Sequence, residues 1–95
     1  GLPFDANTGI KQVDNLIKKA NDGDVKAQAA LGHMYMEGDK VSTDYTLAYM
    51  WFNIARANGD KKAKDIIRDL TKQMNNSQVN EAQKLASLWW DTYRR

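Results

Sequence analysis

Few side chains of this 95-residue chain could carry out chemistry, and cysteine is absent. His33 is the single histidine, and Glu37 lies one helical turn after it. A catalytic histidine needs a nucleophile and an orienting acid nearby, and a metal site needs three or four ligands. The sequence around His33 offers only a carboxylate at the i+4 position, which is a common exposed helix pair. We therefore predict a structural or surface role for His33.

A short loop with acidic flanks superficially suggests a calcium site. Glu37, Asp39 and Asp44 lack the alternating ligands and terminal bidentate glutamate of an EF-hand loop. Gly38 and Gly59 are not followed by the lysine and hydroxyl residue of a phosphate-binding loop. We interpret these residues as helix caps and terminators, and we predict no metal and no cofactor.

The composition is typical of a single globular domain, with 42% hydrophobic and 27% charged residues. The net charge of +2 is too small to predict nucleic-acid binding. The charge is unevenly divided, because residues 1–59 have a net charge of −1 and residues 60–95 one of +3. Nucleic-acid binding through the basic part is a third possibility, which salt-sensitive retention on a polyanion would reveal. No apolar run approaches the roughly 20 residues that cross a bilayer, so we predict no membrane insertion.

Apolar residues recur at helical spacing along nearly the whole chain, which predicts an all-α fold of about five helices. The expected helices cover about 10–20, 25–37, 44–58, 61–74 and 75–93. Asp24 is the expected N-cap of the second helix, and Asn75 with Gln78 resembles a capping box at the start of the fifth. Ser42 or Thr43 is expected to cap the third helix, with Asp44 in its first turn.

The two helix junctions at Gly23 and Gly59 show an internal repeat. Four residues reappear 36 positions later with identical or similar character, namely Gly23, Asp24, Ala27 and Leu31 as Gly59, Asp60, Ala63 and Ile67. A period of this size predicts a helical solenoid of antiparallel pairs. In the hairpin of the second and third helices, small Ala27 and Gly32 leave room for bulky Trp51 and Phe52.

These residues resemble the Sel-one-like repeat, a relative of the tetratricopeptide repeat. The match begins with the segment AQAALGHMYMEG at 27–38 and continues through Val41, Asp44, Tyr45, Ala48, Trp51 and Ala55 to Gly59. The chain departs from the family pattern at Lys40, Ser42, Arg68 and Thr71, where the family has glycine, proline, glycine and tyrosine. The resemblance implies a right-handed α-α superhelix.

The resemblance divides the chain, as a single domain of residues 1–95, into an N-terminal capping helix at 10–23, a complete repeat at 24–59, and a degenerate half-repeat with a closing helix at 60–93. It implies a scaffold or adaptor that binds a protein or peptide, as a monomer or weak homodimer. Family members are frequently bacterial and often exported. Together with the absence of an initiator Met, this favours a periplasmic or secreted location.

In stacked helix pairs, the first helix of each pair is expected to line a concave groove. Its groove residues are those on the side opposite the face that packs against the partner helix. The predicted groove consists of Lys26, Ala30, His33, Glu37, Lys62, Ile66, Asp69 and Gln73. The alternative is an ordinary solvated helix face. Charge reversal of Lys26 and Lys62 would distinguish the two.

Trp89 and Trp90 cannot share one helix face, because adjacent helix positions point about 100° apart. Trp89 belongs to the apolar stripe, and Trp90 is the candidate exposed anchor. Trp90 either binds a partner or covers the open end of the solenoid.

An enzyme is the main alternative to a binding module. Some members of the family have been linked to hydrolysis of β-lactam-like compounds, but those members are cysteine-rich. This chain has no cysteine and no recognisable set of nucleophile, base and orienting acid. We therefore predict that it is not an enzyme.

Overall fold

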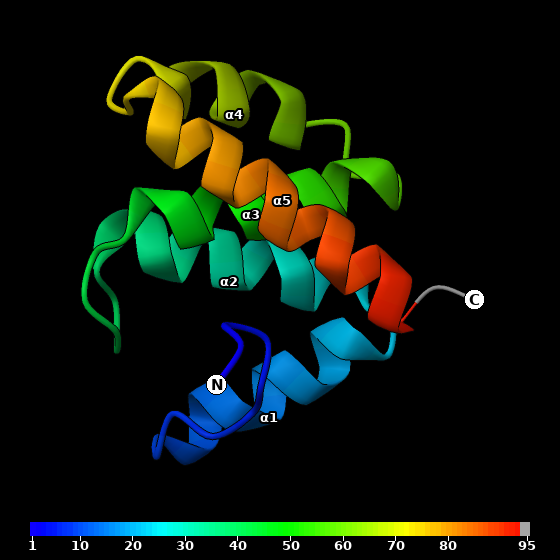
Figure 1. Ribbon diagram of the computed structural model, residues 1–95. Coiled ribbons are helices and arrows are strands. Elements are labelled where there is room, and N and C mark those ends of the chain that lie inside the picture. Colours follow the sequence, from blue (N-terminus) through cyan, green and yellow to red (C-terminus); the bar gives the residue numbers. More distant parts are fainter. Residues whose placement is uncertain (94–95) are drawn as a thin grey trace.

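Residues 1–93 are described by the computed structural model of the chain, and within them there are five helices and no strand (Figure 1). The helices are α1 (Lys11–Asn21), α2 (Val25–Glu37), α3 (Tyr45–Ala57), α4 (Ala63–Thr71) and α5 (Asn76–Tyr93). The all-α prediction is confirmed. In this part of the chain no helix combines the length and the apolar character needed to cross a membrane.

Two of the predicted helix starts are confirmed by their side-chain hydrogen bonds. The Asp24 carboxylate accepts from the backbone N–H of Ala27 at 3.1 Å, which caps α2. Before α5, the side chains of Asn75 and Gln78 each accept from the backbone N–H of the other, at 2.8 and 2.9 Å. This reciprocal pair is a capping box.

The start of α3 differs from the prediction. Neither Ser42 nor Thr43 caps the helix, because Asp44 itself is the N-cap and its carboxylate accepts from the N–H of Leu47 at 3.0 Å. The N–H of Asp44 in turn donates to the carbonyl of Tyr35 at 2.9 Å, so the cap is fixed to α2. Within the loop, Lys40 has a φ of 65°, a left-handed conformation that favours glycine.

Helix α4 is shorter at both ends than the expected 61–74. At its start, Asp60 accepts from the N–H of Lys62 at 3.0 Å, which holds Lys61 and Lys62 in a turn before the helix begins. At its end, the N–H groups of residues 72–74 donate to carbonyls three residues back. Such i to i−3 bonds tighten the chain and end the α-helix.

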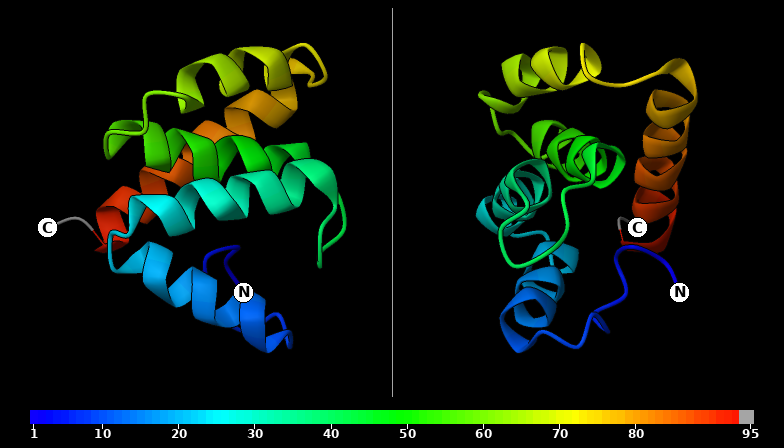
Figure 2. Two further views of the ribbon diagram at one scale, coloured as in Figure 1. Left: turned by 180° about the vertical axis from the view of Figure 1, so that it is seen from behind. Right: turned by 90° about the vertical axis from the view of Figure 1, so that its left-hand side faces the viewer.

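Helix α3 lies at the centre of the arrangement and packs against α2, α4 and α5. Helices α2, α3 and α4 follow each other as antiparallel neighbours, so α2 and α4 run in the same direction (Figure 1). Helix α1 packs under α2, whereas α5 crosses the other side of α3 (Figure 2). This arrangement is compatible with a solenoid of helix pairs. The division into repeats and the handedness remain predictions.

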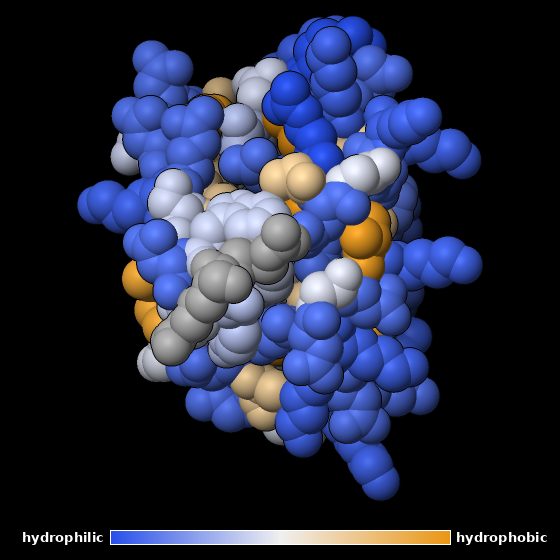
Figure 3. Space-filling model, turned by 90° about the vertical axis from the view of Figure 1, so that its right-hand side faces the viewer, coloured by the Kyte–Doolittle hydropathy of each residue, from blue (hydrophilic) through white to orange (hydrophobic). Residues whose placement is uncertain are grey.

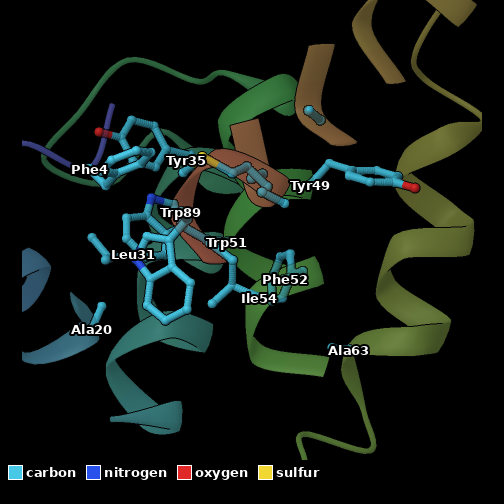
Figure 4. Packing of buried hydrophobic residues seen from close by; sticks show 14 of the residues in the cluster. Phe4, Ala20, Leu31, Tyr35, Tyr49, Trp51, Phe52, Ile54, Ala63 and Trp89 are labelled. Atoms are coloured by element: carbon cyan, nitrogen blue, oxygen red, sulfur yellow. The ribbon is translucent and has the colours of Figure 1, made fainter. Parts of the chain in front are cut away.

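Helix α3 is buried along most of its length, since every residue from Ala48 to Ala55 except Asn53 is buried, while Arg56 and Ala57 at its end are exposed. Met50, Trp51, Phe52 and Ile54 are each 0% exposed and belong to one core cluster with residues of the other helices (Figure 4). The cause is that α3 has three neighbouring helices instead of one. Among the described residues, the indole Nε1 of Trp51 is a buried donor without a partner. Such a donor costs about 1–3 kcal/mol, which the packing around α3 must offset.

The N-terminal segment and α5 meet at Asn21, the last residue of α1. The Asn21 side chain donates to the carbonyl of Phe4 at 2.9 Å and accepts from Nε1 of Trp89 at 2.9 Å. The rings of Phe4 and Tyr93 contact each other edge to face, with centroids 5.7 Å apart. Residues before α1 are therefore tied to the end of α5, on the side of the molecule that α5 covers.

Gln28 is the only polar side chain among the fully buried residues of the described part. Its Nε2 donates to the carbonyl of Ala20 at 2.9 Å, and its Oε1 accepts from Nδ2 of Asn58 at 2.9 Å. These two bonds join the end of α1, the body of α2 and the end of α3. The side chain thus fixes the two helix junctions against each other.

Gly32 sets the distance between α2 and α3. A Cβ atom at this position would lie 2.8 Å from three atoms of the Phe52 ring, closer than any real contact. The Phe52 ring is fully buried within the core cluster, so it can move only by displacing its neighbours. The absence of a side chain at Gly32 therefore allows the two helices to approach closely.

We predict that Gly32→Ala lowers the free energy of unfolding by about 1–2 kcal/mol. Overpacking against Phe52 costs about 1–3 kcal/mol, and the better helix propensity of alanine returns about 1 kcal/mol of it. Urea unfolding measures the difference. In a Phe52→Leu background the same substitution should be neutral or stabilising, and equal destabilisation in both backgrounds would contradict the account.

We expect Gln28→Leu to cost about 1–2 kcal/mol of stability, because two buried hydrogen bonds are lost at about 1 kcal/mol each. Thermal unfolding followed by circular dichroism measures the change. Gln12→Leu on the exposed face of α1 is the matched control and should stay within about 0.5 kcal/mol of the unsubstituted chain. Equal effects of the two substitutions would rule out a special role for Gln28.

Candidate functional site

The predicted groove residues lie on α2, on α4 and, for Lys62 and Gln73, in the turns directly before and after α4, on the opposite side of α3 from α5 (Figure 2). Six of the eight are exposed, and Ala30 and Ile66 are half-buried. Helix α3 separates the two helices and contacts both. The surface is therefore built from three helices, with α2 and α4 as its walls and α3 between them. We call this surface the α2–α4 face.

His33 holds a structural position at the centre of the α2–α4 face. Its ring stands edge to face against Phe52, with centroids 5.0 Å apart and planes at 89°. Its Nδ1 lies 3.7 Å from Oε2 of Glu37, and both side chains are about half exposed.

The carboxyl-terminal ends of α2 and α4 enclose a hollow, which we call the C-terminal hollow. Met36 of α2, Tyr45 of α3 and Leu70 of α4 give it apolar and aromatic walls, while Asp69 and Gln73 supply polar groups. The right-hand view of Figure 2 looks onto this end of the molecule, beside the loop between α2 and α3. The hollow thus joins two predicted groove residues to three others.

Sequence reasoning selected Asp69 and Gln73 but missed Met36, Tyr45 and Leu70 as parts of the site. Helical phase locates residues on one helix face, but it does not show which side chains of a third helix fill the space between two others. Tyr45 and Leu70 carry an apolar signal that is equally typical of the core. The missing information is the separation of α2 and α4, which depends on the whole of α3.

The opposite end of the α2–α4 face is hydrophilic. Lys26 and Lys62 lie at the amino-terminal ends of their helices, and both are exposed. Small hollows at the two helix junctions have mostly charged linings, one with Arg56, Gly59, Asp60, Lys61 and Lys64, the other with Lys19, Asp22, Gly23 and Asp24. Figure 3 shows this end, where hydrophobic residues form only separate small patches. The predicted groove therefore has a basic amino-terminal end.

Trp90 is half-buried and stands edge to face against the ring of Trp89, with centroids 5.1 Å apart. Trp89 is fully buried, as its place in the apolar stripe predicted. Both belong to α5 and lie away from the α2–α4 face. The structure therefore does not bring Trp90 together with the predicted groove.

Among the described residues, two titratable groups have displaced pKa values, and neither lines the C-terminal hollow. Hydrogen bonds from Thr8 lower the pKa of Asp14, with 2.6 Å between the Thr8 hydroxyl and the carboxylate. Burial, with help from the charges of Asp44 and Asp14, raises the pKa of Tyr35. Residues 1–93 contain no group of three His, Cys, Asp or Glu side chains that could hold a metal ion.

The described residues form an all-α arrangement of packed antiparallel helices, with α2 and α4 on the side of α3 that faces away from α5 (Figure 2). No protein-family model matches the sequence. Over 54 residues the chain is 39% identical to the secretory immunoglobulin A-binding protein EsiB of Escherichia coli O6:H1. The matched segment is 57% of this chain and 10% of EsiB, so the match covers only about a tenth of that relative's length. The name of EsiB describes a protein that binds another protein.

Proposed function

We propose that this chain is a protein-recognition module of the Sel-one-like repeat type, and that the α2–α4 face is its binding surface. The observation that carries the proposal is the difference between the two sides of α3. One side is covered by α5, which packs along α3 (Figure 2). The other side has exposed walls and a hollow with Met36, Tyr45 and Leu70 in it.

The shape and chemistry of this face favour an extended peptide or a helix of another protein. Apolar side chains in a hollow supply anchoring contacts, and charged residues at a rim select partners. Walls of packed helices change little on binding, so less ordering entropy is lost. The similarity to EsiB supports protein binding in general. Secretory immunoglobulin A is therefore a reasonable first partner to test.

We further propose that the chain does not catalyse a reaction. The aromatic contact of His33 with Phe52 and its pairing with Glu37 account for this residue structurally. We expect the hydrolysis of a chromogenic β-lactam to equal the background rate for both the unsubstituted chain and His33→Gln. Turnover by the unsubstituted chain that disappears in His33→Gln would contradict this proposal.

The binding face is tested by selecting peptides from a random library against the immobilised chain and measuring their affinity for charge-reversed variants. The double variant Lys26→Glu and Lys62→Glu should weaken the selected peptides about tenfold, which corresponds to about 1.4 kcal/mol. Both lysines are exposed, so their replacement should leave the fold intact. Circular dichroism checks this.

The double variant Lys11→Glu and Lys84→Glu is the matched control, since it makes the same change of charge on exposed residues of α1 and α5. It should bind the peptides as the unsubstituted chain does. Equal loss in the two double variants would mean that net charge controls binding. No loss in either would remove the amino-terminal end of the α2–α4 face from the site.

A further inference from the structure

The C-terminal hollow combines features that fit one kind of side chain. Met36 and Leu70 offer aliphatic surface, Tyr45 offers a ring, and Asp69 and Gln73 offer oxygen acceptors. A long side chain with an apolar stem and a cationic head matches this combination, because the stem buries against apolar groups while the head stays near water. We propose that the hollow receives an arginine side chain of the bound partner, a step that rests on the proposed function.

The electrostatics of this end favour a cation. Helices α2 and α4 end here, at Glu37 and Thr71, but α3 and α5 begin at the same end, at Tyr45 and Asn76 (Figure 1). The helix dipoles therefore offset one another, and the carboxylates decide the sign. Asp69 lies in the hollow itself, and Glu37 follows Met36 directly. The α2–α4 face is therefore basic at its amino-terminal end and acidic at the C-terminal hollow. This difference orients a bound partner so that its cation lies at the C-terminal hollow.

The lysines near the C-terminal hollow pair only weakly with nearby carboxylates, so a cation of the partner can still bind there. Lys72 pairs with Asp69 at 3.7 Å, and Lys40 pairs with Asp39 at 3.6 Å. Both partners of the Lys72–Asp69 pair are about 70% exposed, at 70% and 68%. Such surface pairs are worth at most about 1 kcal/mol, so a partner's cation can displace Lys72 from Asp69.

Arginine fits the hollow better than lysine because of its planar head. A guanidinium group stacks on an aromatic ring and pairs with a carboxylate through two parallel hydrogen bonds. Tyr45 and Asp69 supply the ring and the carboxylate from different helices, α3 and α4. An ammonium group makes neither the flat stack nor the two-point pairing.

The test uses three capped tripeptides as probes, Ala-Arg-Ala, Ala-citrulline-Ala and Ala-Lys-Ala, titrated into the isotope-labelled chain. Citrulline has nearly the shape of arginine without its charge. We expect Ala-Arg-Ala to shift the NMR signals of the Met36 methyl group and the Gln73 side-chain amide. Because the ligand is so small, we expect a Kd of about 1 mM. Ala-Lys-Ala should bind more weakly, and Ala-citrulline-Ala should cause no saturable shift.

Three variants locate the effect. Asp69→Asn should weaken Ala-Arg-Ala about fivefold, because the charged partner of the guanidinium is lost. Lys72→Gln should tighten binding about twofold to threefold, since it removes the competing cation. Lys64→Gln is the matched control, with the same loss of charge at the other end of α4, and it should change nothing.

Equal binding of the arginine and citrulline peptides, or an unchanged affinity in Asp69→Asn, would overturn the arginine assignment. Binding of Ala-Lys-Ala as tight as that of Ala-Arg-Ala would overturn the choice of arginine over lysine. If library peptides depend on Lys26 and Lys62 while Ala-Arg-Ala leaves the Met36 signal in place, this inference fails and the proposed function stands. If Ala-Arg-Ala binds as expected but the affinity of the library peptides does not depend on Lys26 and Lys62, the proposed function fails and the arginine site stands.

Discussion

The close approach of α2 to α3 at Gly32 is the constraint on which the rest of this structure depends. The Phe52 ring occupies the space that any side chain at position 32 would need. The same ring also contacts the ring of His33 edge to face. This packing determines how far α2 stands from α3 and therefore how deep the surface beside it is. The α2–α4 face is thus a consequence of core packing between two helices, although its residues are exposed.

Helix α3 transmits this constraint to the other helices, because it packs against α2, α4 and α5 at once. Its buried residues point to all sides, so a change in one contact affects the others. Asn21 closes the molecule on the α5 side by joining the N-terminal segment to Trp89. The proposed binding surface is on the opposite side of α3, where α2 and α4 lie (Figure 2).

The sequence was sufficient to predict features that depend on neighbouring residues. The caps at Asp24 and at Asn75 with Gln78 involve residues three positions apart, and both are confirmed. Features that join distant residues were missed. The buried bonds of Gln28 link positions 20 and 58, and the C-terminal hollow needs Met36, Tyr45 and Leu70 from three helices. Their separations depend on tertiary packing, which a single sequence does not encode in its periodicity.

The most direct measurement is the chemical-shift map of a library-selected peptide on the isotope-labelled chain. Our account predicts that the perturbed amide signals lie on α2 and α4 and around Tyr45, while the outer face of α5 and residues 1–9 remain unaffected. Perturbations concentrated on α5, around Trp90 or along the N-terminal segment would contradict it, because the partner would then bind the side of α3 that we describe as already covered.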